Sequence, residues 1–97
     1  PETVTSTSKA LFINYGEKEA FYSMKAITKL RSFGVKVELY PDKVKVGKQF
    51  QHADKRGIPY VVIVGESEMN EGKFALKNLV SGEQVLLDFE GLKEALL

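Results

Sequence analysis

The chain has 97 residues, of which 43% are hydrophobic and 28% charged, and its formal net charge is +1. This length suits one compact domain and is too short for two independent cores, and the composition is that of folded proteins rather than disordered or fibrous ones. Cysteine is absent, which excludes disulfides and thiolate metal sites, and no apolar run approaches the length of a membrane span, so we expect a soluble, cytoplasmic protein.

Residues 1–8 contain Thr and Ser in place of an apolar pattern, and we interpret them as a linker exposed by cutting a longer protein. Residues 9–97 form the predicted domain. Its first strand covers residues 9–15, where the consecutive apolar side chains Leu11, Phe12 and Ile13 indicate a strand that is buried on both faces.

Residues 17–33 are predicted to form a helix, since acids precede bases along it and Gly34 follows it. The helical spacing of Ala20, Met24, Ile27 and Leu30 predicts that these four side chains face the core. A short alternating strand is expected at residues 35–40, and it is ended by a proline.

Residues 46–56 are predicted to form an amphipathic and basic helix. Val46, Phe50 and Ala53 lie on one stripe, and the residues expected outside it are Lys45, Lys48, Gln49, His52, Lys55 and Arg56. Gly57 ends this helix, Pro59 prevents its continuation, and residues 60–64 form a continuous strand run.

A hairpin is predicted next, from strand-like runs at residues 73–79 and 84–89 that are separated by a Ser-Gly-Glu turn. The chain ends in a short helix, residues 90–97, with Leu92, Ala95 and Leu96 turned inward. The order of elements predicts an α/β fold of three layers, in which three helices flank a mixed five-stranded sheet with parallel βαβ units.

Motifs for catalysis are not convincing in this chain. Its scattered glycines match neither the dinucleotide fingerprint nor the P-loop. The start of the helix after Asn14 and Tyr15 is a candidate anion site, but the acids placed there oppose an anion. His52 has no Ser or Cys partner at a suggestive spacing, and Glu66, Glu68 and Glu71 are either a solvated loop or a divalent metal site.

Charge is distributed unevenly, with 11 bases and 6 acids in residues 1–60 and 3 bases and 7 acids in residues 61–97. The basic stretches at residues 25–36 and 43–56 either bind phosphate or are solvated helix faces. Loops that follow parallel strands meet at one edge of a sheet. At that edge Tyr15, residues 42–48 and residues 66–68 supply an aromatic ring, cations and carboxylates, which suit contacts with single-stranded RNA.

These ordered features resemble the C-terminal anticodon-binding domain of class IIa aminoacyl-tRNA synthetases, most closely the bacterial histidyl-tRNA synthetase family. The similarity covers nearly all of residues 9–97 and rests on the segments GKQFQHADKRGIPYVVIVGESE and EGKFALKNLVSGEQ. The residues in register are Gly47, Lys48, Gln49, Ala53, Asp54, Gly57, Pro59, Gly65, Glu68, Gly72, Lys73, Lys77 and Gln84.

The resemblance implies binding of the tRNA anticodon stem-loop, with ATP, magnesium and histidine handled by a separate catalytic domain of a homodimeric ligase. No catalytic residue, metal site or cofactor is therefore expected within this chain, and residues 1–8 would lead toward that domain. The RNA-binding residues expected from the resemblance and from the loop positions are Asn14, Tyr15, Lys43, Lys45, Lys48, Gln49, Glu68, Lys73 and Lys77.

Within this set the resemblance implies that Glu68, Lys77 and Lys43 face the anticodon bases, which for histidine are GUG. Related members tend to carry Arg and Asn at the positions of Lys77 and Lys43, and Lys lacks the planar fork and the amide of those residues. Contact with phosphate is thus an alternative to contact with bases. An alternative for the whole domain is a synthetase-like paralogue that is used for protein interaction or regulation.

Overall fold

The computed structural model describes residues 8–97, and residues 1–7, which make up most of the predicted linker, lie outside the described residues. Nine elements follow one another along the chain. They are β1 (Ala10–Phe12), α1 (Glu17–Ser32), β2 (Val37–Leu39), α2 (Val46–Arg56), β3 (Tyr60–Ile63), α3 (Glu66–Glu71), β4 (Phe74–Asn78), β5 (Gln84–Leu87) and α4 (Phe89–Leu96).

The five strands form one mixed sheet in the order β2-β1-β3-β4-β5. Strands β2, β1 and β3 are parallel, whereas β4 pairs antiparallel with both β3 and β5. Helix α1 connects β1 to β2, and helix α2 connects β2 to β3. The hairpin of β4 and β5 completes the sheet. The predicted mixed five-stranded α/β fold is confirmed.

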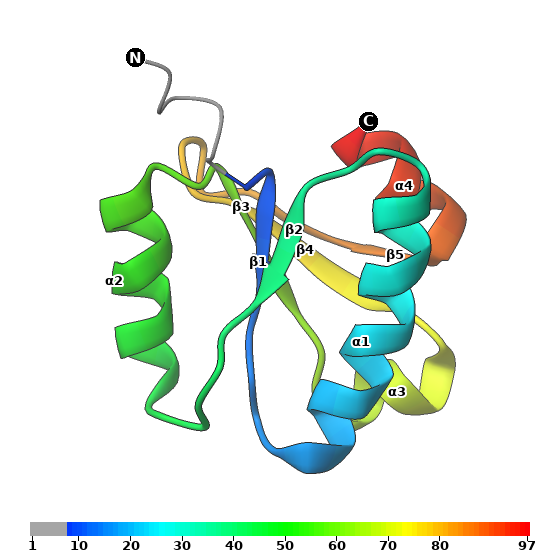
Figure 1. Cartoon of the computed structure of the whole chain (residues 1–97), viewed down its shortest axis with the longest axis horizontal. Helices are drawn as coiled ribbons and strands as arrows, with labels where there is room; N and C mark the ends of the chain where they lie inside the picture. The colour runs from blue at the N-terminus through cyan, green and yellow to red at the C-terminus, as the bar shows by residue number, and fades with distance from the viewer. Residues whose placement is uncertain (1–7) are drawn as a thin grey trace.

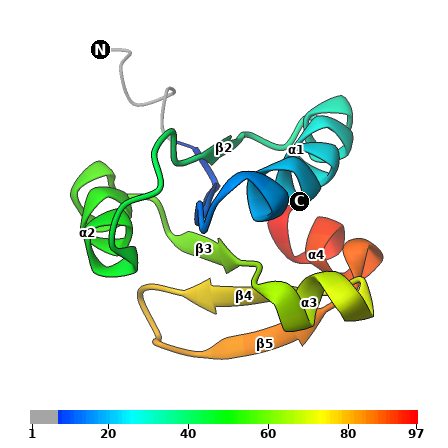
Figure 2. The ribbon, with the colours of Figure 1, turned by 90° about the horizontal axis from the view of Figure 1, so that it is seen from below.

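Helices cover the two faces of the sheet unequally. Helix α2 lies on one face, and α1, α3 and α4 lie on the other (Figures 1 and 2). The face toward α2 is covered over β1 and β3, where Leu11, Ile13 and Val61 pack with Ala53. On the opposite face, α1 and α4 enclose the larger core, whose members include Phe12. Strands β4 and β5 are therefore left open on the side of α2.

Local signals explain where the predicted elements end. Helix α1 has Glu17 and Glu19 in its first turn and Lys29 and Arg31 in its last, and these charges interact favourably with the helix dipole. Helix α2 ends at Gly57, whose φ of 72° lies in the left-handed region. Every residue of β1 is buried, as the apolar run predicted.

The sequence-based prediction differs from the structure in several places. A fourth helix, the six-residue α3, lies where a loop was expected. In α1 the side chain of Met24 is exposed, because the buried face of this helix is centred on Ser23, Ala26, Ile27 and Leu30. In α4, Leu92 and Leu96 are buried as predicted. Ala95, expected inward, is exposed.

Ser23 gives a direct test of this core. Its hydroxyl is fully buried in α1 and has no hydrogen-bond partner among the described residues. A buried hydroxyl without a partner costs about 1–3 kcal/mol, and Ala is also the better helix former. We therefore expect Ser23→Ala to raise the free energy of unfolding by about 1 kcal/mol, measured by urea denaturation. Ser32→Ala, at an exposed position, is the matched control, and a loss of stability in Ser23→Ala would contradict this description of the core.

Candidate nucleic-acid interface

Gln49 and Asn14 form a buried polar link between the end of β1 and the start of α2. The Gln49 side-chain oxygen accepts a hydrogen bond from the Asn14 backbone N–H at 2.7 Å, and its Nε2 donates to the carbonyls of Asn14 and Val44 at 2.9 and 3.0 Å. Asn14 Nδ2 in turn donates to the carbonyl of Tyr40 at 2.9 Å. One network thus fixes the loops that follow β1 and β2.

This network corrects the predicted roles of both amides. Gln49 was expected outside the buried stripe of α2, yet its side chain is 0% exposed and all its polar groups are used internally. Asn14 is only 8% exposed, and its Oδ1 accepts from the Gly16 N–H at 2.9 Å. Neither side chain is presented to a ligand, so both act by positioning the loops around them.

Tyr15 and Glu68 are neighbours at the edge where the parallel strands end. Burial raises the pKa of the Tyr15 phenol above its ordinary value, and the negative charge of Glu68 raises it further. The hydroxyl therefore stays protonated throughout the physiological range and is a hydrogen-bond donor. The structure brings together an aromatic ring and a carboxylate that are separated by more than fifty positions in the sequence.

The side chain of Glu68 is held by the short helix α3. Its Oε1 accepts a hydrogen bond from the Gly65 N–H at 2.8 Å, which caps the start of the helix. The Lys73 backbone N–H donates to the Glu68 carbonyl at 2.9 Å, so the chain returns toward β4 immediately beside this helix. The cap uses one carboxylate oxygen of Glu68 and orients the whole group.

Lys77 lies on the open half of the sheet, on the face toward α2. Its Nζ is 5.5 Å from the ring centroid of Phe50. In the antiparallel pair of β4 and β3, Lys77 lies opposite Val61. Leu86 of β5 alternates onto the same face and is 49% exposed. Lys77 and Leu86 of the sheet thus place a cation and an apolar side chain beside α2, which contributes the ring of Phe50.

Three exposed lysines lie in the loop before α2 and in the first turn of this helix. Lys43, Lys45 and Lys48 are exposed around the start of the helix, at the same edge as Tyr15 and Glu68. Lys43 also borders a cavity of about 440 Å³ at the ends of β1 and β2. Its lining residues are Asn14, Gly16, Glu17, Ala20, Pro41, Asp42 and Lys43.

Arg56, at the far end of α2, is committed to an ion pair within the domain. Its guanidinium contacts the Glu38 carboxylate at 2.9 and 3.0 Å. Burial alone would raise the pKa of Glu38, but hydrogen bonds from Ser8 and Arg56 and the nearby positive charges lower it. His52 packs edge-on against Tyr40, with ring centroids 5.1 Å apart. Of the two bases in the last turn of α2, Arg56 is thus paired within the domain, whereas Lys55 is exposed.

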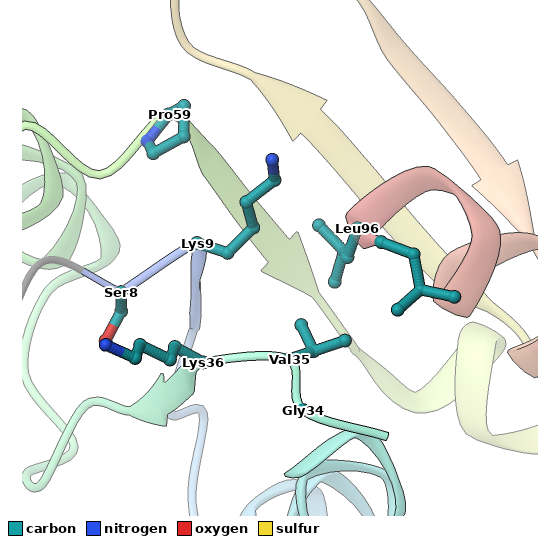
Figure 3. Close-up of a pocket in the computed structure, with 8 residues that line it drawn as sticks. Ser8, Lys9, Gly34, Val35, Lys36, Pro59 and Leu96 are labelled. Carbon is teal, nitrogen blue, oxygen red and sulfur yellow. The ribbon is translucent and has the colours of Figure 1, made fainter. Parts of the chain in front are cut away.

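Two further observations concern the rest of the surface. A cavity of about 450 Å³ opens at the opposite edge of the sheet, where Lys9 points between Pro59 and Leu96 (Figure 3), and it contains no residue of the predicted site. Within residues 8–97, three or more His, Asp or Glu side chains nowhere gather as they would around a metal ion, and no helix is long and apolar enough to cross a bilayer.

Comparison with known proteins identifies the domain. Residues 9–97 match the family described as anticodon binding domain. The chain belongs to this family. A histidine–tRNA ligase from Flavobacterium johnsoniae is 67% identical over 97 residues, which are 100% of this chain and 20% of that protein. The corresponding protein of Christiangramia forsetii is 59% identical over 96 residues, 99% of this chain and 21% of its own length.

A solved structure gives the same result in three dimensions. The anticodon-binding domain superposes on histidyl-tRNA synthetase from Nostoc with a TM-score of 0.87 and 36% sequence identity, over 93% of this chain and 22% of that one. The chain spans about a fifth of the length of the relatives it matches.

Phe50 is the residue of this anticodon-binding domain surface that sequence reasoning missed. It was predicted on the core stripe of α2 and does pack against the core cluster on that face, but it is only partly buried and also lies beneath Lys77. The sequence feature that could have indicated its exposure is its position between the basic residues Lys48 and Lys55. The pairing with Lys77 depends on the sheet register and has no local signature.

Removing the Gln49 amide should destabilise the anticodon-binding domain. In Gln49→Met a side chain of similar length fills the space, but the N–H of Asn14 and the carbonyls of Asn14 and Val44 lose their buried partner. We expect the free energy of unfolding to fall by about 2–4 kcal/mol in urea denaturation. Gln51→Met, two positions along the helix and exposed, should change it by less than about 0.5 kcal/mol. Equal effects of the two changes would refute the structural role of Gln49.

Proposed function

We propose that this domain binds the anticodon stem-loop of histidine tRNA as part of a longer histidine–tRNA ligase. The observation that carries the proposal is the 67% identity to such a ligase across the whole of the chain. The cluster of lysines, aromatic rings and a carboxylate around the open half of the sheet supports it. In the longer protein, which we expect to be homodimeric, ATP with magnesium and histidine would bind outside residues 1–97.

The surface suggests a division between holding the RNA and distinguishing its bases. Lys43, Lys45 and Lys48 are exposed cations on one edge, which suits contacts with successive phosphates. Phe50 and Leu86 provide an aromatic and an apolar surface for unstacked bases. The Glu68 oxygen that is not used by the Gly65 cap would accept a hydrogen bond from a base N–H, with guanine as the preferred partner.

Lys77 would contact the RNA through its single ammonium group. Because its ammonium lies over the Phe50 ring, a base that packs against the exposed part of this ring would also come within reach of the charge. An ammonium lacks the two parallel donors of a guanidinium, so Lys77 would contact a phosphate or one base oxygen. Lys73 and Tyr15 would border the same RNA from the side of α3.

A titration with a fluorescently labelled anticodon stem-loop of histidine tRNA tests the function. We expect salt-sensitive binding, and we expect the triple change Lys43→Gln, Lys45→Gln and Lys48→Gln to weaken it and to reduce the slope of log K against log salt by about 2. The matched control replaces three lysines away from this edge, Lys9, Lys25 and Lys29, by Gln and should leave the slope nearly unchanged.

Base recognition is tested by Glu68→Gln with stem-loops of altered anticodon. The domain should prefer the GUG anticodon, and Glu68→Gln should reduce that preference by about tenfold, because a good base contact contributes about 1–3 kcal/mol. Equal binding of all stem-loops by the unmodified domain would contradict the proposal. An unchanged preference for the GUG anticodon in Glu68→Gln would show that Glu68 does not recognise a base.

A further inference from the structure

A second, smaller cavity lies on the face of the sheet opposite α2. It has a volume of about 220 Å³ and opens between α1, the turn from α3 to β4, and the start of α4. Its lining residues are Tyr22, Lys25, Ala26, Lys29, Gly72, Phe74 and Phe89. None of these residues is required by the proposed RNA contacts, which lie at the edge near Tyr15 and on the side of α2.

Aromatic rings form the walls of this cavity. The rings of Tyr22 and Phe74 are 5.4 Å apart between centroids and tilted by 36°, and Phe12 supports Phe74 edge-on from the core at 6.4 Å. Phe89 closes the cavity from α4. Tyr22 and Phe74 touch each other and form one wall, and a flat ring that packs against it gains both apolar burial and favourable ring contacts.

Two lysines border the cavity, one helical turn apart on α1. Lys25 Nζ lies 4.9 Å from the Phe21 ring centroid, and Lys29 Nζ lies 5.3 Å from that of Phe89. Neither ammonium has an ion pair with a carboxylate among residues 8–97, and the nearby Glu90 pairs instead with Lys93 at 3.1 Å. The border of an aromatic cavity therefore carries two positive charges that no carboxylate neutralises.

We propose that this cavity is a second ligand site, which takes one flat aromatic ring bearing a carboxylate or phosphate group. The ring would lie between the touching pair Tyr22 and Phe74 on one side and Phe89 on the other, and the anionic group would lie between Lys25 and Lys29. The size fits, since an apolar cavity of about 150 Å³ accepts benzene and sites for drug-sized molecules begin near about 300 Å³. Burial raises the pKa of the Tyr22 phenol, so its hydroxyl stays a donor near the anion.

This site is independent of the proposed RNA binding. It is on the other face of the sheet, and its two lysines are outside the lysine set around the start of α2. The anionic ring is either a free small molecule or an acidic aromatic group at the end of a peptide. Both sources share the same chemistry, and they are distinguished by the choice of probe.

Isothermal titration of the 97-residue chain tests the site with indole-3-acetate and phenyl phosphate as anionic probes, and with indole and phenol as neutral ones. We expect the anionic probes to bind with a Kd on the order of 1 mM or lower and at least about tenfold more tightly than the neutral ones. The binding should weaken with added salt. A short peptide that ends in Glu-Phe, assayed in parallel, assigns the site to a peptide group if it binds about tenfold more tightly than the free acids.

Two variants locate the site. Lys25→Gln with Lys29→Gln should weaken the anionic probes at least about tenfold and leave the neutral probes unchanged, whereas Lys9→Gln with Lys55→Gln removes the same charge elsewhere and should change neither. Phe89→Leu keeps the apolar volume and should weaken all ring-bearing probes. Equal binding of anionic and neutral probes, or an equal effect of both lysine pairs, would overturn the proposal.

Discussion

The hydrogen bonds of the buried Gln49 carboxamide determine the arrangement of the edge at which we propose that RNA binds. This carboxamide joins Asn14 in the β1–α1 loop to the loop before α2, and Asn14 extends the link to Tyr40, the residue after β2. An amide serves here because the backbone groups that face it include both donors and acceptors, and only a side chain with both can pair with all of them. The positions of Tyr15 and Lys43 follow from this link.

The two faces of the sheet have different tasks because the helices cover them unequally. Three helices close one face over the larger core, whereas α2 covers only β1 and β3 on the other. The uncovered half carries Lys77, a poor choice for a core, and Leu86, which is 49% exposed, and the pair would suit a surface that accepts unstacked bases. Helix α3 then holds Glu68 at the border of this surface through its own cap. The fold thus leaves the half of the sheet formed by β4 and β5 uncovered on the side of α2, where we propose that RNA binds.

Much of this architecture was predictable from the sequence. Apolar runs, glycine stops and the order of charges gave the strands and α1, and the resemblance carried by residues 47–68 and 71–84 indicated the family. Residue polarity misled the prediction for Gln49. Its spacing of three from Val46 and four from Ala53 places it on the buried stripe, but an amide is rarely assigned to a core without knowledge of its partners, and these came from the distant Asn14.

Other differences have related physical causes. Helix α3 is too short and too polar to show helical periodicity, and its one signal is the Glu68 side chain three residues after Gly65. The contact of Lys77 with Phe50 depends on the register of β3 and β4, which only the assembled sheet defines. Local patterns thus predict elements, whereas the composition of the site depends on contacts between residues far apart in the sequence.

The central claim is that RNA binds to the edge near Tyr15 and to the open half of the sheet beside α2. Titrating the ¹⁵N-labelled domain with the histidine anticodon stem-loop and following the backbone amide resonances tests this claim most directly. The account predicts that the largest shifts fall at residues 15, 43–50, 66–77 and 84–86, with α1 and α4 little changed beyond their first turns. Shifts concentrated on the outer faces of α1 and α4 would contradict it.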